Sequence, residues 1–192
     1  MTIQPYQIFN QIPNWESGIS VKYSYLTSLI SSQRYKEQRK AMRDIPLRSI
    51  SFDMLLDSSS MEIFNYIIAC LQKIMYVPLF NERVLCKSTG DNLSVIDTED
   101  TENFYNLRRL SPENVIVNTP GSIYGETQIQ TVSGTIDDGT IPVDPISMSY
   151  ISDVTTIYPA LPATLSSIKK TSESAKLDTY NLTFDEFVEE TL

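Results

Sequence analysis

The sequence predicts a mainly β protein with one principal α-helix, in the α+β class. Three observations indicate this fold. Short segments in the first third alternate apolar with polar residues, and one longer segment repeats its apolar residues every three or four positions. The second half holds Thr-, Val- and Ile-rich segments separated by turn residues. We expect a small strand–helix belt domain followed by a β-sandwich or barrel-like domain.

Three regions are expected along the 192 residues. Residues 1–18 are rich in Gln, Asn and Pro, and we expect an extended N-terminal arm that Trp15, the only tryptophan, anchors to the body. Residues 19–82 are expected to form the belt domain, a strand pair with the helix. Residues 83–192 are expected to form the β-rich domain with an acidic C-terminal end.

The belt domain begins with two alternating segments that predict a strand pair. The segment ISVKYSYLTSLI starts at residue 19, and its apolar positions on one side are Ile19, Val21, Tyr23 and Tyr25. The segment LRSISFDMLL starts at residue 47, and its expected inner positions are Ile50, Phe52 and Met54. A second strand that returns beside the first is the simplest interpretation, so the basic residues between them connect or broaden a hairpin.

A helix is expected over residues 59–75. The apolar residues of this segment that recur at helical spacing are Ile63, Ile67, Leu71 and Ile74. Residues 57–60 supply possible N-caps, and Pro78 is expected to end the helical segment. Such an apolar stripe is typical of a core-facing helix, and Cys70 inside it is expected to be a small core residue.

Short strands are expected throughout the second half. An Asp-Gly turn signal at residues 137–140 separates two of them. Prolines at 142, 145, 159 and 162 favour edge strands or extended arms, because proline cannot donate to a sheet ladder. The alternation of Tyr180, Leu182 and Phe184 predicts a final strand that ends in an acidic, solvated segment.

Composition argues against most enzyme classes. The chain has no histidine, which excludes His-based acid–base catalysis and most zinc sites. Cys70 and Cys86 form no CxxC unit, no disulfide is expected between them, and Cys86 is expected to be half-buried. The acidic residues at 97–102 lack the EF-hand pattern and are interpreted as a solvated loop. A hydrolase that uses these carboxylates, with a metal bound there, is the enzymatic alternative. We expect no enzyme activity, no cofactor and no small-molecule substrate.

The sequence predicts no membrane span. No apolar segment approaches the roughly 18 residues that a spanning helix needs. The first residues, MTIQPYQIFNQIPNW, show no basic segment followed by an apolar one, so we expect no secretory signal.

Positive charge is concentrated in one segment of a strongly acidic protein. The segment SSQRYKEQRKAMRDIPLR, residues 31–48, holds six of the fifteen Lys and Arg residues of a chain with net charge −9. With its two acidic residues the segment carries +4, six minus two, so the remainder carries −13. A positive stripe on an acidic protein is complementary to the rest of its own surface.

Three interpretations of this basic segment are open. The first is nucleic-acid binding, which the charge balance disfavours, since Tyr35 is the only aromatic residue in the segment and the acidic remainder repels a polyanion. A solvated connection is the second. We favour the third, docking on an acidic surface of another copy, because arginine forms paired bonds with carboxylates at interfaces. The expected interface residues are Arg39, Arg43 and Arg48, with Arg34 weaker and Trp15 included, and their expected partners are residues 97–102 or the acidic C-terminal end.

A further pattern runs through residues 14–80. Trp15 and Gly18 precede a Tyr-containing strand that ends in YLTSLISS, and EQRKAMRDIPLRSISF follows. This second segment contains, in order, Glu37-Gln38-Arg39, Arg43, Pro46 and Arg48, and the segment VPLF comes after the helix. In this order of residues the chain resembles a family of bacteriophage tail proteins.

The resemblance implies a structural protein of the virion tail, of the distal tail, baseplate or tail-sleeve type, made in the host cytoplasm. It implies a ring assembled from copies of the chain, with other tail subunits as further partners. The alternative left open by the residues is a carbohydrate- or receptor-binding β module of a virion, since eleven tyrosines and many Asn and Thr residues are available to line a sugar site.

Overall fold

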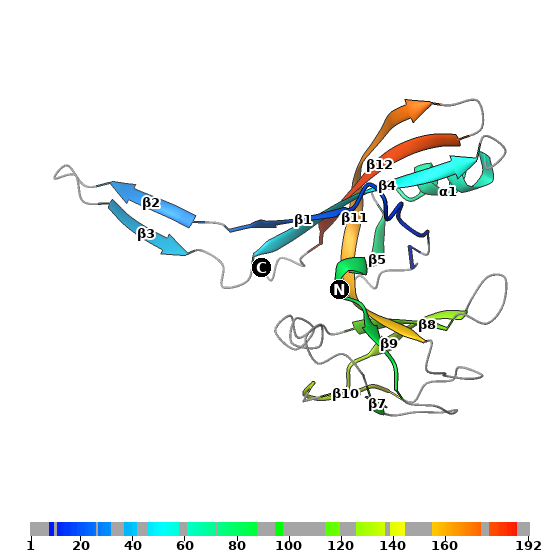
Figure 1. Ribbon diagram of the computed structural model, residues 1–192. Coiled ribbons are helices and arrows are strands. Elements are labelled where there is room, and N and C mark those ends of the chain that lie inside the picture. Colours follow the sequence, from blue (N-terminus) through cyan, green and yellow to red (C-terminus); the bar gives the residue numbers. More distant parts are fainter. Residues whose placement is uncertain are drawn as a thin grey trace. The chain divides into compact units, whose positions relative to one another are not determined.

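Over the residues that it describes, the computed structural model is mainly β with one α-helix, as predicted (Figure 1). It describes residues 8–9, 11–25, 27–31, 37–41, 46–57, 61–71, 73–87, 95–97, 114–119, 126–136, 139–144, 155–173 and 177–187. Strands predominate within these ranges, and nearly all strand pairs are antiparallel. The sandwich or barrel expected for the second half is not confirmed, because the large sheet does not close on itself.

The chain forms two compact units, each built from two separate segments. Unit 1 comprises Met1–Gln11 and Ile74–Pro162, and unit 2 comprises Ile12–Lys73 and Ala163–Leu192. The predicted regions followed chain order, whereas the units do not, because the last strand returns to a strand of the first third. Strand β11 (Thr156–Glu173) contributes its first residues to unit 1 and its remainder to unit 2.

Unit 2 is an antiparallel sheet in the order β1–β4–β12–β11. Its first three strands are β1 (Ile19–Ser24), β4 (Leu47–Asp57) and β12 (Leu177–Glu186). Strand β1 pairs with β4 from Ile19↔Phe52 to Ser24↔Leu47, which confirms the predicted strand pair. The first strand is shorter than predicted, because it ends at Ser24 and Thr27–Ser31 forms a strand of another sheet, β2. Strand β12 lies on the other side of β4, so the predicted C-terminal strand is also confirmed.

Alternation gives this sheet an apolar face and a polar face. The buried side chains of the apolar face on β4 and β12 are Ile50, Phe52, Met54, Leu182 and Phe184. The rings of Phe52 and Phe184 stack with their centroids 5.7 Å apart. The opposite face carries serine, threonine, asparagine and aspartate side chains. The three inner positions predicted on β4 are therefore correct.

Helix α1 (Met61–Ala69) belongs to unit 2 and is shorter than predicted. The ring of Phe64 lies 5.0 Å from that of Tyr180 on β12, so the helix covers the apolar face. The expected extension to residue 75 is wrong, because a turn follows Ala69 and Ile74–Pro78 forms strand β5. The β-branched and aromatic residues of IMYVP fit a buried strand better than a helix end. No helix of the described ranges is long and apolar enough to cross a membrane.

Strand β11 contains two β-bulges where it pairs with β12. The register shifts between Leu165 and Ser167 and again between Lys170 and Ser172. Both extra residues, Ser166 and Thr171, donate a side-chain hydroxyl hydrogen bond of 3.2 Å to a carbonyl of β12. The sequence thus places hydroxyl residues where the interrupted ladder leaves a carbonyl to be satisfied.

The prolines of β11 correct the expectation of edge strands. Pro159 and Pro162 lie inside a strand that has neighbours on both sides in the sheet order. Pairing with β8 ends at Pro159↔Val115, and pairing with β12 begins at Ala163. Both prolines therefore stand where one ladder ends and the next begins, so that few ladder donors are lost. Pro142 agrees with the expectation, because it ends β10, a strand of the two-stranded sheet β10–β7.

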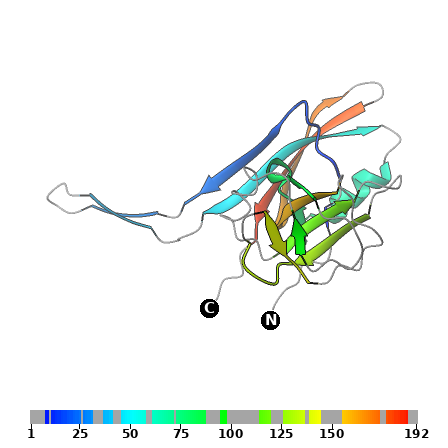
Figure 2. The ribbon, with the colours of Figure 1, turned by 60° about the horizontal axis from the view of Figure 1, so that its bottom comes forward.

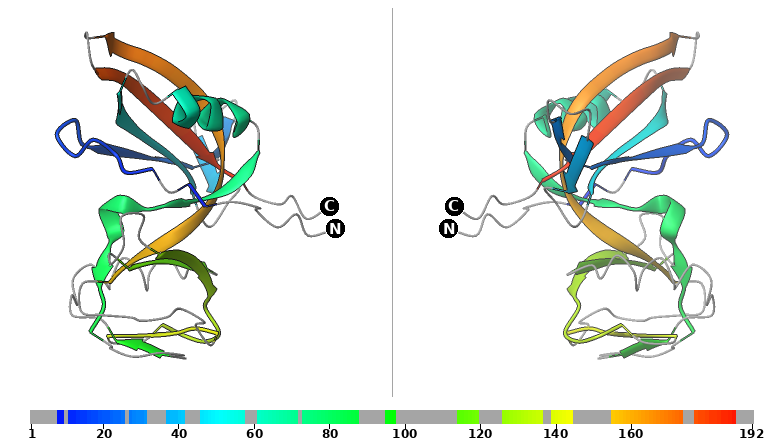
Figure 3. Two further views of the ribbon diagram at one scale, coloured as in Figure 1. Left: turned by 90° about the vertical axis from the view of Figure 1, so that its right-hand side faces the viewer. Right: turned by 90° about the vertical axis from the view of Figure 1, so that its left-hand side faces the viewer.

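Unit 1 is built from short strands. They are β5, β6 (Val84–Leu85), β7 (Val95–Asp97), β8 (Asn114–Thr119), β9 (Glu126–Thr131), β10 (Thr140–Pro142) and the first part of β11, with a 3-10 turn at Phe80–Glu82. The β8–β9 pair and the β7–β10 pair lie on opposite sides of this unit (Figure 3). Gly139 has a positive φ of 76° directly before β10, as a turn at the predicted Asp-Gly position requires.

The N-terminal segment and the cysteines are more buried than expected. Phe9 is fully buried, and its N–H donates a hydrogen bond to the carbonyl of Tyr76 on β5, so this part of the expected arm belongs to unit 1. Cys70 is buried as predicted. Cys86, expected to be half-buried, is completely buried in the core of unit 1, and both cysteines are free thiols.

We predict that Phe184→Ala lowers the free energy of unfolding by about 3–5 kcal/mol, because it removes a fully buried ring that stacks on Phe52. The matched control is Asp185→Ala on the opposite face of the same strand, where the side chain is exposed. Urea unfolding measures both. Equal effects of the two substitutions would contradict the role of β12 in the core of unit 2.

Candidate interaction site

The basic segment forms part of a β-hairpin within unit 2. Strands β2 (Thr27–Ser31) and β3 (Glu37–Ala41) pair antiparallel from Thr27↔Ala41 to Ser31↔Glu37. This two-stranded sheet is separate from the main one, and it extends beyond the ends of β1 and β4 (Figure 2). We call residues 27–41 the basic hairpin. The basic segment therefore connects the two strands of the predicted pair, as one of its two interpretations held, and it does not broaden their sheet, because β2 and β3 form a separate one.

The basic hairpin carries a net charge of +3. It contains four basic residues and one acidic residue, Glu37. Because the whole chain has a net charge of −9, the remainder carries −12. Arg39 lies on β3 opposite Leu29 in the register. The predicted interface residues Arg34 and Arg43 lie outside the described residues.

Arg48, the last arginine of the predicted interface, forms an ion pair inside unit 2. Its guanidinium contacts both carboxylate oxygens of Glu186 at the end of β12, with a distance of 3.1 Å from Nε to Oε2. The backbone N–H of Arg48 donates a third hydrogen bond, of 2.8 Å, to the same Oε2. The two side chains are only 15% and 9% exposed, so water screens this pair weakly.

This ion pair changes the interpretation of the acidic C-terminal end. The sequence predicted a solvated end, which is wrong for Glu186 because its carboxylate is nearly buried against Arg48. The sequence also proposed the C-terminal carboxylates as partners of the arginines, and Glu186 is such a partner within the same chain. A contact of Arg48 with a neighbouring subunit stays a prediction.

Trp15 lies in a turn before β1. The N–H of Gly18 donates a hydrogen bond of 3.3 Å to the Trp15 carbonyl, and Gly18 has a positive φ of 76°. The N–H of Asn14 donates one of 2.7 Å to the carbonyl of Asp53 on β4, which holds this turn against the sheet. The indole is 51% exposed. Trp15 therefore presents an aromatic surface to solvent at the edge of unit 2.

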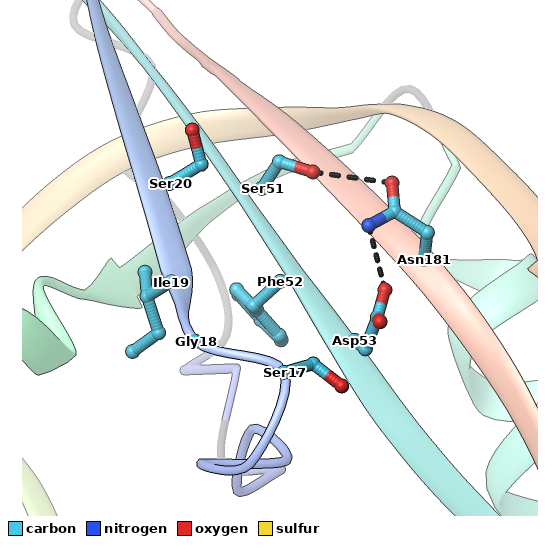
Figure 4. A pocket seen from close by; sticks show the side chains of 8 residues that line it. All are labelled: Ser17, Gly18, Ile19, Ser20, Ser51, Phe52, Asp53 and Asn181. Carbon is cyan, nitrogen blue, oxygen red and sulfur yellow. Dashed lines mark hydrogen bonds between the residues drawn. The ribbon is translucent and has the colours of Figure 1, made fainter.

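A shallow polar notch lies between this turn and the polar face of β4 and β12 (Figure 4). Asn181 of β12 lies at one side of the notch, where its amide donates a hydrogen bond of 2.7 Å to Asp53 Oδ1 and its carbonyl oxygen accepts one of 3.1 Å from Ser51. Ser51 in turn accepts a bond of 3.3 Å from Thr183. The volume is about 230 Å³, and the remaining lining residues are Ser17, Gly18, Ile19, Ser20 and Phe52.

Tyr66 on α1 and Cys70, which directly follows this helix, offer no nucleophile at neutral pH. Burial, together with the neighbouring Cys70 thiol, raises the pKa of Tyr66 to about 12. Burial also raises the pKa of the Cys70 thiol above its usual value. Both groups thus stay protonated at pH 7, and a thiol is a poor nucleophile. Among the described residues no three acidic or cysteine side chains gather as metal ligands, and most of the acidic segment 97–102 lies outside those residues.

Sequence reasoning missed two features of unit 2. Glu186 was grouped with the solvated carboxylates because charge alone does not reveal a buried partner. The Asp53–Asn181 contact was missed because the alternation of apolar residues predicts the buried face of a strand and not which polar side chains meet on the other face. The alternating polar positions of SISFD and TYNLT carried the available signal, since polar side chains on paired strands face each other.

We predict that Glu186→Gln lowers the free energy of unfolding by roughly 1–3 kcal/mol, because it leaves the Arg48 charge partly buried without a carboxylate. The control Asp185→Asn removes the same charge from an exposed neighbour and is expected to change it by less than about 0.5 kcal/mol. Urea unfolding in the same buffer measures both. A loss no larger for Glu186→Gln than for the control would show that the ion pair contributes nothing to stability.

No model of a protein family matches the chain, and no curated protein matches it.

Proposed function

We propose that this protein is a non-enzymatic structural subunit of a bacteriophage tail, which assembles into a ring through its basic hairpin. The observation that carries the proposal is the basic hairpin itself. It concentrates positive charge on a two-stranded ribbon, and β2 and β3 pair only with each other among the described residues. Such a ribbon has the reach to contact a neighbouring copy.

The stability of isolated hairpins supports a partner for this ribbon. A two-stranded hairpin without a third strand or a covering helix is only marginally stable in water. The five-residue strands of the basic hairpin have no further strand in the described residues. Docking on another subunit would bury part of the ribbon and offset the entropy of ordering it.

Charge supports the identity of that partner. The basic hairpin at +3 belongs to a chain whose remainder carries −12, so a second copy offers a complementary acidic surface. A nucleic acid would be repelled by this remainder. The partners in this proposal are therefore copies of the chain and other tail subunits. The assignment to a phage tail, and with it the location in the virion, is supported by the sequence resemblance over residues 14–80.

A sandwich-like unit 1 remains part of the proposal. Its core cluster combines side chains from strands of the main sheet with side chains from the β7–β10 region, as expected between two layers. The members are Val84, Cys86, Val115, Val117, Ile136, Ile141, Val143 and Ile157. A packed core of this kind in unit 1 would suit a protein whose role is structural.

We predict that Arg39→Glu weakens self-association by roughly 2–5 kcal/mol, because it reverses a charge that the proposal places against carboxylates of a neighbouring copy. Sedimentation velocity at low and high salt measures the association. Because charged contacts are screened by salt, the parent is expected to assemble less at high salt, and the variant is expected to show little salt dependence.

The matched control for this experiment is Lys169→Glu, an equal change of charge at an exposed position of β11. Urea unfolding establishes that both variants are folded. If the folded Arg39→Glu protein assembles like the parent, the basic hairpin is a solvated surface and the proposed assembly is wrong.

The polar notch favours a second function, recognition of a carbohydrate by the virion. Carboxylate, amide and hydroxyl groups converge there, as in sites that bind sugar hydroxyls. Its volume of about 230 Å³ is below the roughly 300–1,000 Å³ of common ligand pockets, so it would hold at most one sugar ring.

For this second function we predict binding on a glycan array that is lost in Asn181→Ala, because the amide links Ser51 and Asp53. The control Thr179→Ala changes the same face of β12 outside the notch. An array without any signal for the folded parent would remove the carbohydrate alternative.

A further inference from the structure

We propose that strand β1 is a docking edge at which two copies of the chain join their sheets, β1 to β1 and antiparallel. The inference rests on the hydrogen-bonding pattern of unit 2 and not on the proposed tail function. Among the described residues β1 is an end strand of the sheet, and its single partner is β4. Its other side is therefore an edge of the kind that accepts a further strand.

The pattern of backbone hydrogen bonds shows which groups of β1 face this edge. The carbonyl of Asp53 on β4 accepts a hydrogen bond from Asn14, which lies on the β1 side. Since backbone direction alternates along a strand, Ser51 and Ser49 also face β1, and their partners Ser20 and Lys22 face β4. It follows that the N–H and C=O groups of Ile19 and Val21 point outward.

The β12 side gives the same result independently. The carbonyls of Thr179 and Thr183 accept hydrogen bonds from β11, so these residues face away from β4. Leu182 of β12 then faces Phe52 of β4, its register partner. Phe52 thus has its backbone groups turned away from β1, in agreement with the first argument.

The two ends of the unit 2 sheet differ in a way that favours β1. The outer part of β11 carries two bulges, a feature that natural sheets use to prevent strand addition, whereas both strands carry an exposed lysine, Lys169 on β11 and Lys22 on β1. Strand β1 runs through six register pairs without a shift, and it contains no proline. Regular edges of this kind are the ones that recruit another strand.

Side chains select one register for a pair of β1 strands. Centred on Val21, the pairing places Val21 opposite Val21 and Ile19 opposite Tyr23 of the second copy, and each Lys22 faces a serine. Centred one residue later, it places Lys22 opposite Lys22, and like charges directly opposite are destabilising. The register centred on Val21 therefore gives the self-complementary contact that a two-fold dimer requires.

The test introduces opposite charges at the centre of this register. Val21→Glu and Val21→Lys are made in the full-length chain, and each is expected to weaken dimerisation at least about tenfold, because like charges face each other across the two-fold axis. An equimolar mixture is expected to restore dimerisation as a heterodimer, since the charges are then opposite. Sedimentation velocity and native mass spectrometry measure the dimers.

Control variants separate this contact from the basic hairpin and from misfolding. Lys22→Glu is expected to leave dimerisation within about twofold, because Lys22 faces a serine in the proposed register. Repeating the series in the Arg39→Glu background isolates the β1 contact from assembly through the basic hairpin, and urea unfolding confirms that each variant is folded. Only a restored dimerisation in the equimolar mixture of the two variants supports the proposal. In the Arg39→Glu background, a monomeric parent, folded variants that dimerise like this parent, or a mixture without heterodimers overturns the proposal, and none of these results bears on the basic hairpin.

Discussion

The pairing of β4 with β12 is the constraint on which the rest of unit 2 depends. Nine register pairs join them, from Leu177↔Asp57 to Asp185↔Ser49, and the Arg48–Glu186 ion pair extends the contact at one end. The paired residues are far apart in sequence; Ser51 and Asn181 are 130 positions apart. The entropic cost of closing a loop grows only slowly with its length, so this pairing costs little more entropy than a pairing of nearer strands would.

Both faces of the unit 2 sheet follow from that single register. The stacked rings of Phe52 and Phe184 and the helix contact of Tyr180 belong to the apolar face. The polar notch belongs to the other, where Asn181 meets Asp53. A shift by one residue would exchange the two faces and bury the polar network in place of the core. The fold and the candidate carbohydrate site therefore depend on the same alignment.

Local patterns predicted the elements that a periodic sequence specifies, and tertiary contacts decided the others. The alternation of Ile50, Phe52 and Met54 predicted β4 correctly, because one buried face leaves a period of two. The helix was predicted six residues too long at its C-terminal end, since the apolar residues of 70–75 fit a buried strand as well as a helix. The partnership of Arg48 with Glu186 has no local signal, because nothing near either residue identifies its partner. The same is true of a unit composed of two distant segments.

The two proposed contacts would play different parts in an assembly. A contact between identical β1 edges is isologous, so it joins two copies and is then complete. A contact from the basic hairpin to a different surface of the next copy is heterologous, so it repeats until a ring closes. Together they would give dihedral symmetry, with two rings joined across their β1 edges. Salt would affect the two contacts differently. The hairpin contact depends on charge and is screened, whereas the β1 contact depends mainly on backbone hydrogen bonds and apolar pairs. High salt should therefore reduce the assembly to β1-linked dimers before it yields monomers.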